Sequence, residues 1–233
     1  MMTLRPVNHC GKADYGWLQA RYAFSFGHYF DPDFMGFKTL RVLNQEVISP
    51  QSAFQARTYP HVDILNIILQ GHAEYRDSLG NVISANEGEC IRLSPRPDLS
   101  YAEQNVCPQT PLTRLQLWLN ACPQQEYSPY QKITLSPKEN KLIASPDGEN
   151  HSIHLRQQIW ISQICLDSTE KFTANLKGKN AYLQSIHGGA NIRLNSGNHL
   201  NMGCNDGIFI QEETQFAITT DKVFRGLLID LGE

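Results

Sequence analysis

The sequence lacks the long apolar run and the basic block that would point to a membrane or a nucleic acid. No apolar segment in the 233 residues approaches the roughly 20 residues that a membrane-spanning helix needs. The opening residues, MMTLRPVNHCGKADYGW, contain no apolar stretch of the signal-peptide kind. The net charge is −3, and no cluster of Lys and Arg stands out. We therefore expect a cytoplasmic chain that binds neither membranes nor nucleic acid.

Closely spaced cysteines are also missing. The six cysteines form no C-x-x-C pair, which argues against a structural zinc site or a thioredoxin-type site. In a reducing cytosol we expect free thiols, and two of them are candidates for oxidation. Cys122 lies where a strand is expected to leave the first domain, and Pro123 ends regular pairing there, which favours an accessible thiol. Cys10 is the rival candidate, because His9 and Lys12 are close to it in sequence. The alternative that all six thiols are inert stays open.

Helical periodicity is nearly absent, and short strands take its place. Runs of Val, Ile, Leu, Phe and Tyr alternate with clusters of Gly, Asn, Asp and Pro. In ILNIILQGHAEYRDSLGNVISANEGECIRLSP, two extended runs flank a predicted hairpin turn at Gly80 and Asn81. Turns that recur at roughly 8–12 residues favour an all-β sandwich or barrel.

The second half of the chain repeats this scheme. Gly88 and Gly207 each open a short apolar strand at comparable points of the two halves. The Pro- and Gln-rich stretch ACPQQEYSPYQKITLSPKENK is predicted to join the halves, with a boundary near residues 122–140. We therefore predict two antiparallel β-barrels with few short helices, in domains of residues 1–125 and 126–233. Each has a usual domain size of about 100 residues.

Several segments carry a resemblance to a known family. The run FSFGHYFDPDFMGFKTLRVLNQEVISP, from Phe24, is similar to the opening of the pirin family, a group of bicupins. The stretches GHAEYRDSLGN, QLWLNACP and RGLLIDL fit the same family, so the resemblance covers nearly the whole chain. It implies two cupin barrels with iron normally held in the N-terminal one. For some members it also implies quercetin 2,3-dioxygenase activity.

The resemblance further implies four metal ligands: two histidines of a His-Pro-His, then a His and a Glu two residues apart. An alignment without gaps, anchored at Gly71, places these positions on Arg57, Tyr59, Tyr101 and Glu103. Of these four positions, only the one at Glu103 carries the ligand residue of the family. A gapped alignment would instead place Tyr59 and His61 at the first two positions, but it would move Asp63 from the acidic position of the family.

These residues predict a site without a metal. Arginine cannot lose its proton and cannot act as a ligand. Residues 57, 59, 61 and 63 share one strand face, so Arg57 and Tyr59 should point inward toward Tyr101 and Glu103. We expect an ion pair between Arg57 and Glu103 that replaces the charge of the metal. In the alternative interpretation, the tyrosines only fill the barrel and Glu103 is a structural acceptor.

Three functional hypotheses follow. The favoured one is a non-enzymatic protein without a metal or cofactor that binds an unknown small molecule. The second is a redox-responsive protein that acts through Cys122 or Cys10. The third is a metal-dependent quercetin 2,3-dioxygenase that rebuilds a metal site from Glu103, His61 and tyrosines. The sequence specifies no protein partner.

Overall fold

Strands make up most of the chain, as the sequence predicts. The computed structural model describes residues 1–96, 98–121 and 128–232. The described residues form 22 strands and three short 3-10 turns. The turns are η1 (Val7–His9), η2 (Pro32–Phe34) and η3 (Glu149–His151). No helix in the described residues is long and apolar enough to cross a membrane.

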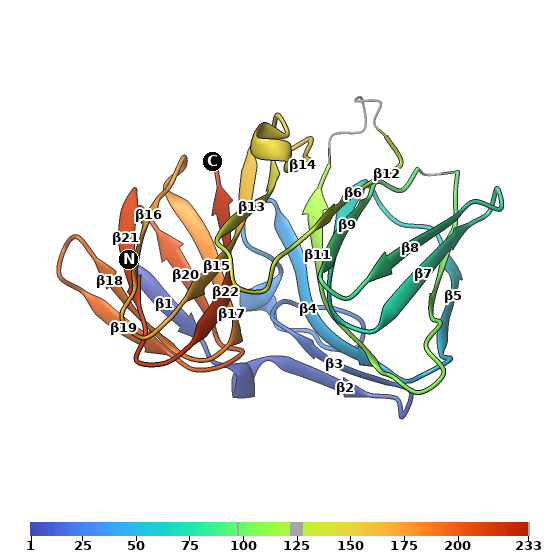
Figure 1. The fold of residues 1–233 in the computed structure, drawn as a ribbon, viewed down its shortest axis with the longest axis horizontal. Helices are drawn as coiled ribbons and strands as arrows, with labels where there is room; N and C mark the ends of the chain where they lie inside the picture. The colour runs from blue at the N-terminus through green and yellow to red at the C-terminus, as the bar shows by residue number, and fades with distance from the viewer. Residues whose placement is uncertain (97, 122–127, 233) are drawn as a thin grey trace. The chain divides into compact units, whose positions relative to one another are not determined.

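The chain divides into two compact units, whose limits differ from the predicted ones. One unit is Gly11–Leu135, and the other combines Met1–Cys10 with Ser136–Glu233. The boundary falls after residue 135 rather than 125, because β12 (Tyr130–Thr134) pairs with β9 (Glu89–Leu93). The first residues join the C-terminal unit because β1 (Met2–Arg5) pairs with β20 (Gly207–Gln211), as Figure 1 shows.

The N-terminal unit consists of a seven-stranded and a four-stranded sheet. The large sheet has the order β12-β9-β6-β11-β4-β3-β2 and the small one β5-β10-β7-β8. The remaining strands of the large sheet are β2 (Gly11–Asp14), β3 (Leu18–Tyr22), β4 (Leu40–Ile48), β6 (Val62–Gln70) and β11 (Leu112–Asn120). Those of the small sheet are β5 (Ala53–Arg57), β7 (His72–Asp77), β8 (Val82–Asn86) and β10 (Tyr101–Asn105).

The C-terminal unit repeats this arrangement. Its large sheet has the order β1-β20-β17-β22-β15-β13-β14, and its small sheet β16-β21-β18-β19. The further strands of the large sheet are β13 (Lys141–Ser145), β14 (Ile153–His154), β15 (Ile159–Leu166), β17 (Asn180–His187) and β22 (Phe224–Leu231). Those of the small sheet are β16 (Lys171–Asn175), β18 (Ala190–Leu194), β19 (His199–Met202) and β21 (Gln215–Thr219). Only the short β13–β14 pair is parallel among the described strand pairs.

Closed barrels, which the sequence analysis predicts, are not observed. In each unit the large and small sheets are separate hydrogen-bonded sheets among the described residues. The chain crosses between them at corners. Gly71, which has a φ of +86°, turns it from β6 into β7, and a Cβ there would lie 2.7 Å from the carbonyl oxygen of Pro111. Such a corner changes sheets without continuing the hydrogen-bond ladder, which makes each unit a sandwich.

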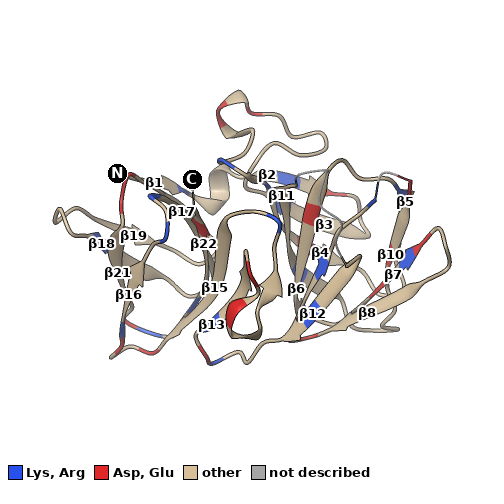
Figure 2. Ribbon diagram, turned by 90° about the horizontal axis from the view of Figure 1, so that it is seen from above, with Lys and Arg blue, Asp and Glu red and all other residues tan. Residues whose placement is uncertain are grey.

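The interior of the N-terminal unit mixes apolar and polar side chains. Facing apolar residues such as Ile64, Ile68 and Tyr75 form its core. Polar side chains lie among them on the inner faces of β4, β6 and β11, where Glu46 is paired in register with Arg114. Figure 2 shows charged residues in strands of this unit as well as in its loops. A buried charged row of this kind requires ionic or hydrogen-bonding partners, and it marks the candidate site.

Candidate functional site

The structure brings the four family metal positions together at one end of the small sheet. Tyr101 on β10 lies opposite Arg57 on β5, and Glu103 lies opposite Phe54 after a register shift. Tyr59 follows β5, and its ring centre is 6.4 Å from that of Tyr101. We call Arg57, Tyr59, Tyr101 and Glu103 the Arg57 site. Tyr101 and Glu103 are buried, whereas Arg57 and Tyr59 are half-buried.

The prediction of an ion pair between Arg57 and Glu103 is wrong, because Glu103 pairs with Arg114 instead. An Nη1 atom of Arg114 on β11 contacts Oε1 of Glu103. The Nε and Nη2 atoms of the same guanidinium donate to Oε2 of Glu46, at 2.9 and 2.6 Å. Arg57 lies at the end of its strand and donates from Nε to the Tyr59 hydroxyl at 3.1 Å. The counter-ion of Glu103 therefore comes from the opposite sheet and is shared with Glu46.

Charge around Arg114 stabilises its guanidinium. Burial alone would lower the pKa of Arg114, but the carboxylate of Glu46 and the hydroxyl of Tyr75 outweigh it, so the pKa is raised. Burial also raises the pKa of Tyr75, which keeps its phenol protonated. The arginine thus stays charged between two carboxylates, and its side chain is inaccessible to solvent. Sequence reasoning missed Arg114, although a Glu and an Arg within otherwise apolar strands are a signal of such a pair.

Aromatic rings enclose the Arg57 guanidinium on one side. Its central carbon lies 5.0 Å from the ring centre of Tyr59 and 5.6 Å from that of Phe54. These distances allow cation–π attraction. Tyr59 packs edge-on against Trp118 at 5.4 Å, and the Trp118 indole donates to Gln116 at 2.9 Å. These contacts fix the orientation of the cation at the edge of the interior.

The donor set at these positions does not fit the metal that the family holds. Arg57 offers no lone pair, and Glu103 is occupied by Arg114. Burial raises the pKa of Tyr101, so its hydroxyl stays a neutral phenol. His61, which the gapped alignment would recruit, is exposed. Within the described residues, no three His, Cys, Asp or Glu side chains gather in a metal-binding arrangement.

The Tyr101 hydroxyl is a second feature of the site. It is buried, and it has no hydrogen-bond partner within the part of the chain that the structure describes. A buried hydroxyl without a partner costs free energy, and a ligand with an acceptor atom would remove that cost. The Arg57 site therefore offers a partly exposed cation and, on the paired strand, a neutral hydrogen-bond donor.

The structure describes Cys10 but not Cys122, the two thiols that are candidates for oxidation. Cys122 lies outside the described residues. Cys10 is half-buried at the end of η1, and its Sγ donates to the carbonyl oxygen of Pro6 at 3.5 Å. Cys204 is exposed and Cys90 is buried, and burial raises the pKa of Cys90. The redox hypothesis therefore stays a prediction.

Comparisons with known proteins cover both units. A family model described as Pirin matches residues 3–119, and a model described as a quercetinase C-terminal cupin domain matches residues 142–231. The pirin-like protein YhaK of Escherichia coli K12 is 53% identical over 99% of each chain. The quercetin 2,3-dioxygenase of the same strain is 29% identical, again over 99% of each chain.

Solved structures agree with the family models. The crystal structure of YhaK from Escherichia coli has a TM-score of 0.82 and 50% identity, and it covers 96% of this chain and 99% of that one. The bacterial pirin YhhW from Escherichia coli, in complex with nickel(II), has a TM-score of 0.91 and 29% identity over 99% of each chain. Both units thus have the cupin-type fold of a bicupin, and the chain belongs to the pirin family.

Proposed function

We propose that the N-terminal unit binds a small organic anion at the Arg57 site without a metal, and that the protein acts in the cytoplasm as a non-enzymatic binding protein. The Arg57 guanidinium carries this proposal. It is half-buried, held by Tyr59, and placed where the pirin resemblance puts a metal ligand. A fixed positive charge at that position attracts an anion and repels a metal cation.

The hydrogen-bonding capacity of the site supports an anionic ligand. Only the Nε of Arg57 donates to another described residue, so both Nη groups are available to a carboxylate. The Tyr101 hydroxyl supplies one more donor. Arg114 pairs with Glu103 and so reduces the repulsion between that carboxylate and an incoming anion, although it shares its charge with Glu46.

The alternative function is metal-dependent quercetin 2,3-dioxygenation. The quercetin 2,3-dioxygenase of Escherichia coli, 29% identical over nearly the full chain, supports it. So does YhhW, which has been solved with nickel(II). The side chains of the Arg57 site argue against it, because an arginine and two tyrosines stand in place of the imidazoles that such metals prefer.

The binding proposal is tested by thermal unfolding of the full chain with acetate, succinate or citrate. A carboxylate that occupies the site should raise the melting temperature, since it binds the folded state alone. Arg57→Gln should abolish this shift. The matched variant Arg41→Gln, which changes an exposed arginine on β4, should keep it. No shift with any carboxylate, or the same shift in Arg57→Gln, would reject the proposal.

A further inference from the structure

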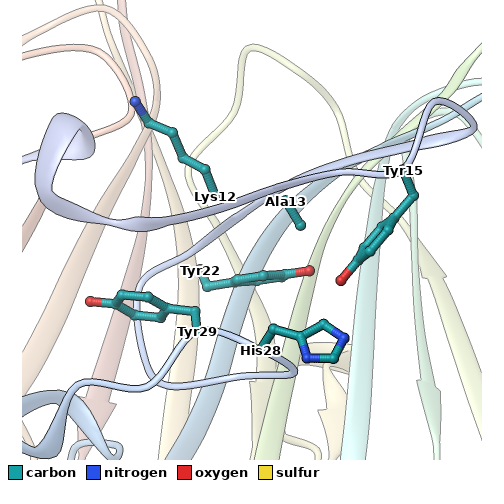
Figure 3. Close-up of a pocket in the computed structure, with 6 residues that line it drawn as sticks. All are labelled: Lys12, Ala13, Tyr15, Tyr22, His28 and Tyr29. Carbon is teal, nitrogen blue, oxygen red and sulfur yellow. The ribbon is translucent and has the colours of Figure 1, made fainter.

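A second pocket lies in the N-terminal unit, between the β2–β3 hairpin and the loop that follows β3. It has a volume of about 400 Å³. This lies in the roughly 300–1,000 Å³ range of small-molecule sites. Figure 3 shows its lining, which we call the Tyr22 pocket: Lys12, Ala13, Tyr15, Tyr22, His28 and Tyr29. None of these six residues belongs to the Arg57 site.

The chain builds this pocket with specific backbone features. Gly11 has no Cβ, which lets the Tyr29 ring pack directly on β2, because a Cβ there would overlap the ring. The Tyr29 hydroxyl donates to Asp31 at 3.2 Å, which fixes the ring at one side of the pocket. Gly27, with a φ of +59°, turns the loop so that His28 faces the pocket from below in Figure 3. The aromatic lining is therefore held from two sides.

The Tyr22 hydroxyl is the polar centre of the pocket. The Tyr22 side chain is only 4% exposed, and it lines the pocket. In Figure 3 the hydroxyls of Tyr15 and Tyr22 point toward one another, with the His28 imidazole near them. Burial, and then the negative charge of Glu46, raise the pKa of Tyr22 to about 12. At neutral pH this hydroxyl is therefore protonated and can donate a hydrogen bond to a ligand.

Charge and shape together narrow the class of ligand. Three tyrosine rings and an imidazole offer flat apolar surfaces, which favour a planar ring. Lys12 is exposed, and in Figure 3 its side chain points away from the Tyr22 and Tyr15 hydroxyls. The acidic neighbour Asp31 is already engaged by the Tyr29 hydroxyl and by the backbone N–H of Asp33. The pocket thus presents hydroxyl donors to the acceptor end of a ligand.

We propose that the Tyr22 pocket binds a small aromatic carboxylate. The ring packs against the tyrosine rings, and the carboxylate accepts hydrogen bonds from the Tyr22 and Tyr15 hydroxyls. The His28 imidazole lies near these hydroxyls and offers a further polar group to the carboxylate. The pocket shares no lining residue with the Arg57 site, although the charge of Arg57 acts on the Tyr22 hydroxyl. This proposal does not depend on the function proposed at the Arg57 site.

A fluorine NMR titration of the full-length protein with 4-fluorobenzoate tests this proposal. The wild-type protein should bind with a dissociation constant below about 1 mM, as expected for a ligand with few atoms. Tyr22→Phe should weaken binding about tenfold, because it removes a hydrogen bond to a charged group. Tyr130→Phe changes an exposed tyrosine of the same unit outside the pocket, and it should leave the affinity unchanged.

A neutral probe and a comparison of the variants identify the ligand class and the binding site. The neutral probe 4-fluorobenzyl alcohol should bind about tenfold more weakly than the carboxylate. Equal affinity for the two probes would overturn the assignment of a carboxylate. No binding of 4-fluorobenzoate, or unchanged binding in Tyr22→Phe with an unaltered melting temperature, would overturn the pocket itself. Loss of binding in Arg57→Gln but not in Tyr22→Phe would place the probe at the Arg57 site and overturn this proposal alone.

Discussion

Three charged side chains meet inside the N-terminal unit, where Arg114 lies between Glu46 and Glu103. All three are almost completely buried, so water cannot replace a lost partner. Arg57 has a different setting, since it is half-buried and bonded to a tyrosine hydroxyl. The two arginines should therefore differ sharply in what they contribute to stability.

Arg114→Met should lower the free energy of unfolding by about 3–5 kcal/mol, because it leaves buried carboxylates without a counter-ion. Arg57→Met should cost less than about 1 kcal/mol, as expected for a partly solvated group. Urea unfolding followed by fluorescence measures both values. Adding Glu46→Gln and Glu103→Gln to Arg114→Met should restore part of the loss. Equal losses in the two arginine variants would contradict the observed pairing.

The thiols should react in the order of their exposure. Alkylation with iodoacetamide, resolved by peptide mass spectrometry, should modify exposed Cys204 early and buried Cys90 last, because burial hides Cys90 and raises its pKa. After mild peroxide, we predict sulfenic acid at Cys122 or Cys10. Oxidation spread evenly over all thiols, or absent from both of these positions, would reject the redox hypothesis.

At the scale of the elements, the hairpin between β7 and β8 is confirmed at the turn predicted from Gly80 and Asn81. Asp77 holds this turn. Its Oδ1 accepts from the backbone N–H groups of Leu79 and Asn81, both at 2.9 Å, and its Oδ2 accepts from the Asn81 side chain at 2.7 Å. The hydrogen bond from the Asn81 side chain, followed by those from the backbone, lowers the pKa of Asp77 below its ordinary value of 3.8.

Asp77→Ala should reduce the melting temperature by a few degrees and remove part of its acid dependence. Because the folded-state pKa lies below 3.8, the contribution of Asp77 is present above that pH and is lost as the pH falls through the folded-state value. Calorimetric scans between neutral and acidic pH measure this difference. Asp221→Ala is the control, since it removes an exposed carboxylate of the other unit. Parallel pH profiles for wild type and Asp77→Ala would contradict the role of Asp77.

Local sequence patterns predict much of the fold and of the site, but they do not predict contacts between sheets. Strand alternation and turn residues predicted the hairpin, and the alignment from Gly71 brought Arg57 and Tyr101 to paired positions. The pairing of Arg114 with Glu103 depends on how the two sheets face each other, which no local pattern encodes. The same limit applies to β12, which falls in the linker composition but pairs with β9, and to β1, which pairs with a strand about 200 residues away in sequence.

At the scale of the whole molecule, each unit contains one strand that a division of the chain by sequence order would assign to the other unit: β1 in the C-terminal unit and β12 in the N-terminal unit. Met2 and Leu4 of β1 pack against the core of the C-terminal unit. Leu4→Asp should therefore accelerate hydrogen exchange in β20 and β17 while leaving exchange in the β7–β8 hairpin unchanged. Leu79→Asp, at an exposed position of that hairpin turn, is the control. Faster exchange in the hairpin of Leu4→Asp would contradict the division into these two units.

A restored metal site would show that the fold itself can still hold a metal. We expect the variant Arg57→His/Tyr59→His/Tyr101→His, with Arg114→Met to release Glu103, to bind nickel(II) in calorimetry. The same histidines with Arg114 retained should bind it more weakly, because Arg114 competes for Glu103. Equal affinity with and without Arg114 would contradict this role of the arginine.

We propose that Arg57 and two tyrosines occupy the positions of the metal ligands that the pirin resemblance implies. Metal analysis of the unmodified protein, purified without chelator and then incubated with iron(II) or nickel(II) and desalted, tests it most directly. We expect far less than one metal ion per chain, and we expect the same metal content in Glu103→Gln. One tightly bound ion per chain that is lost in Glu103→Gln would contradict it and would favour the metal-dependent dioxygenase.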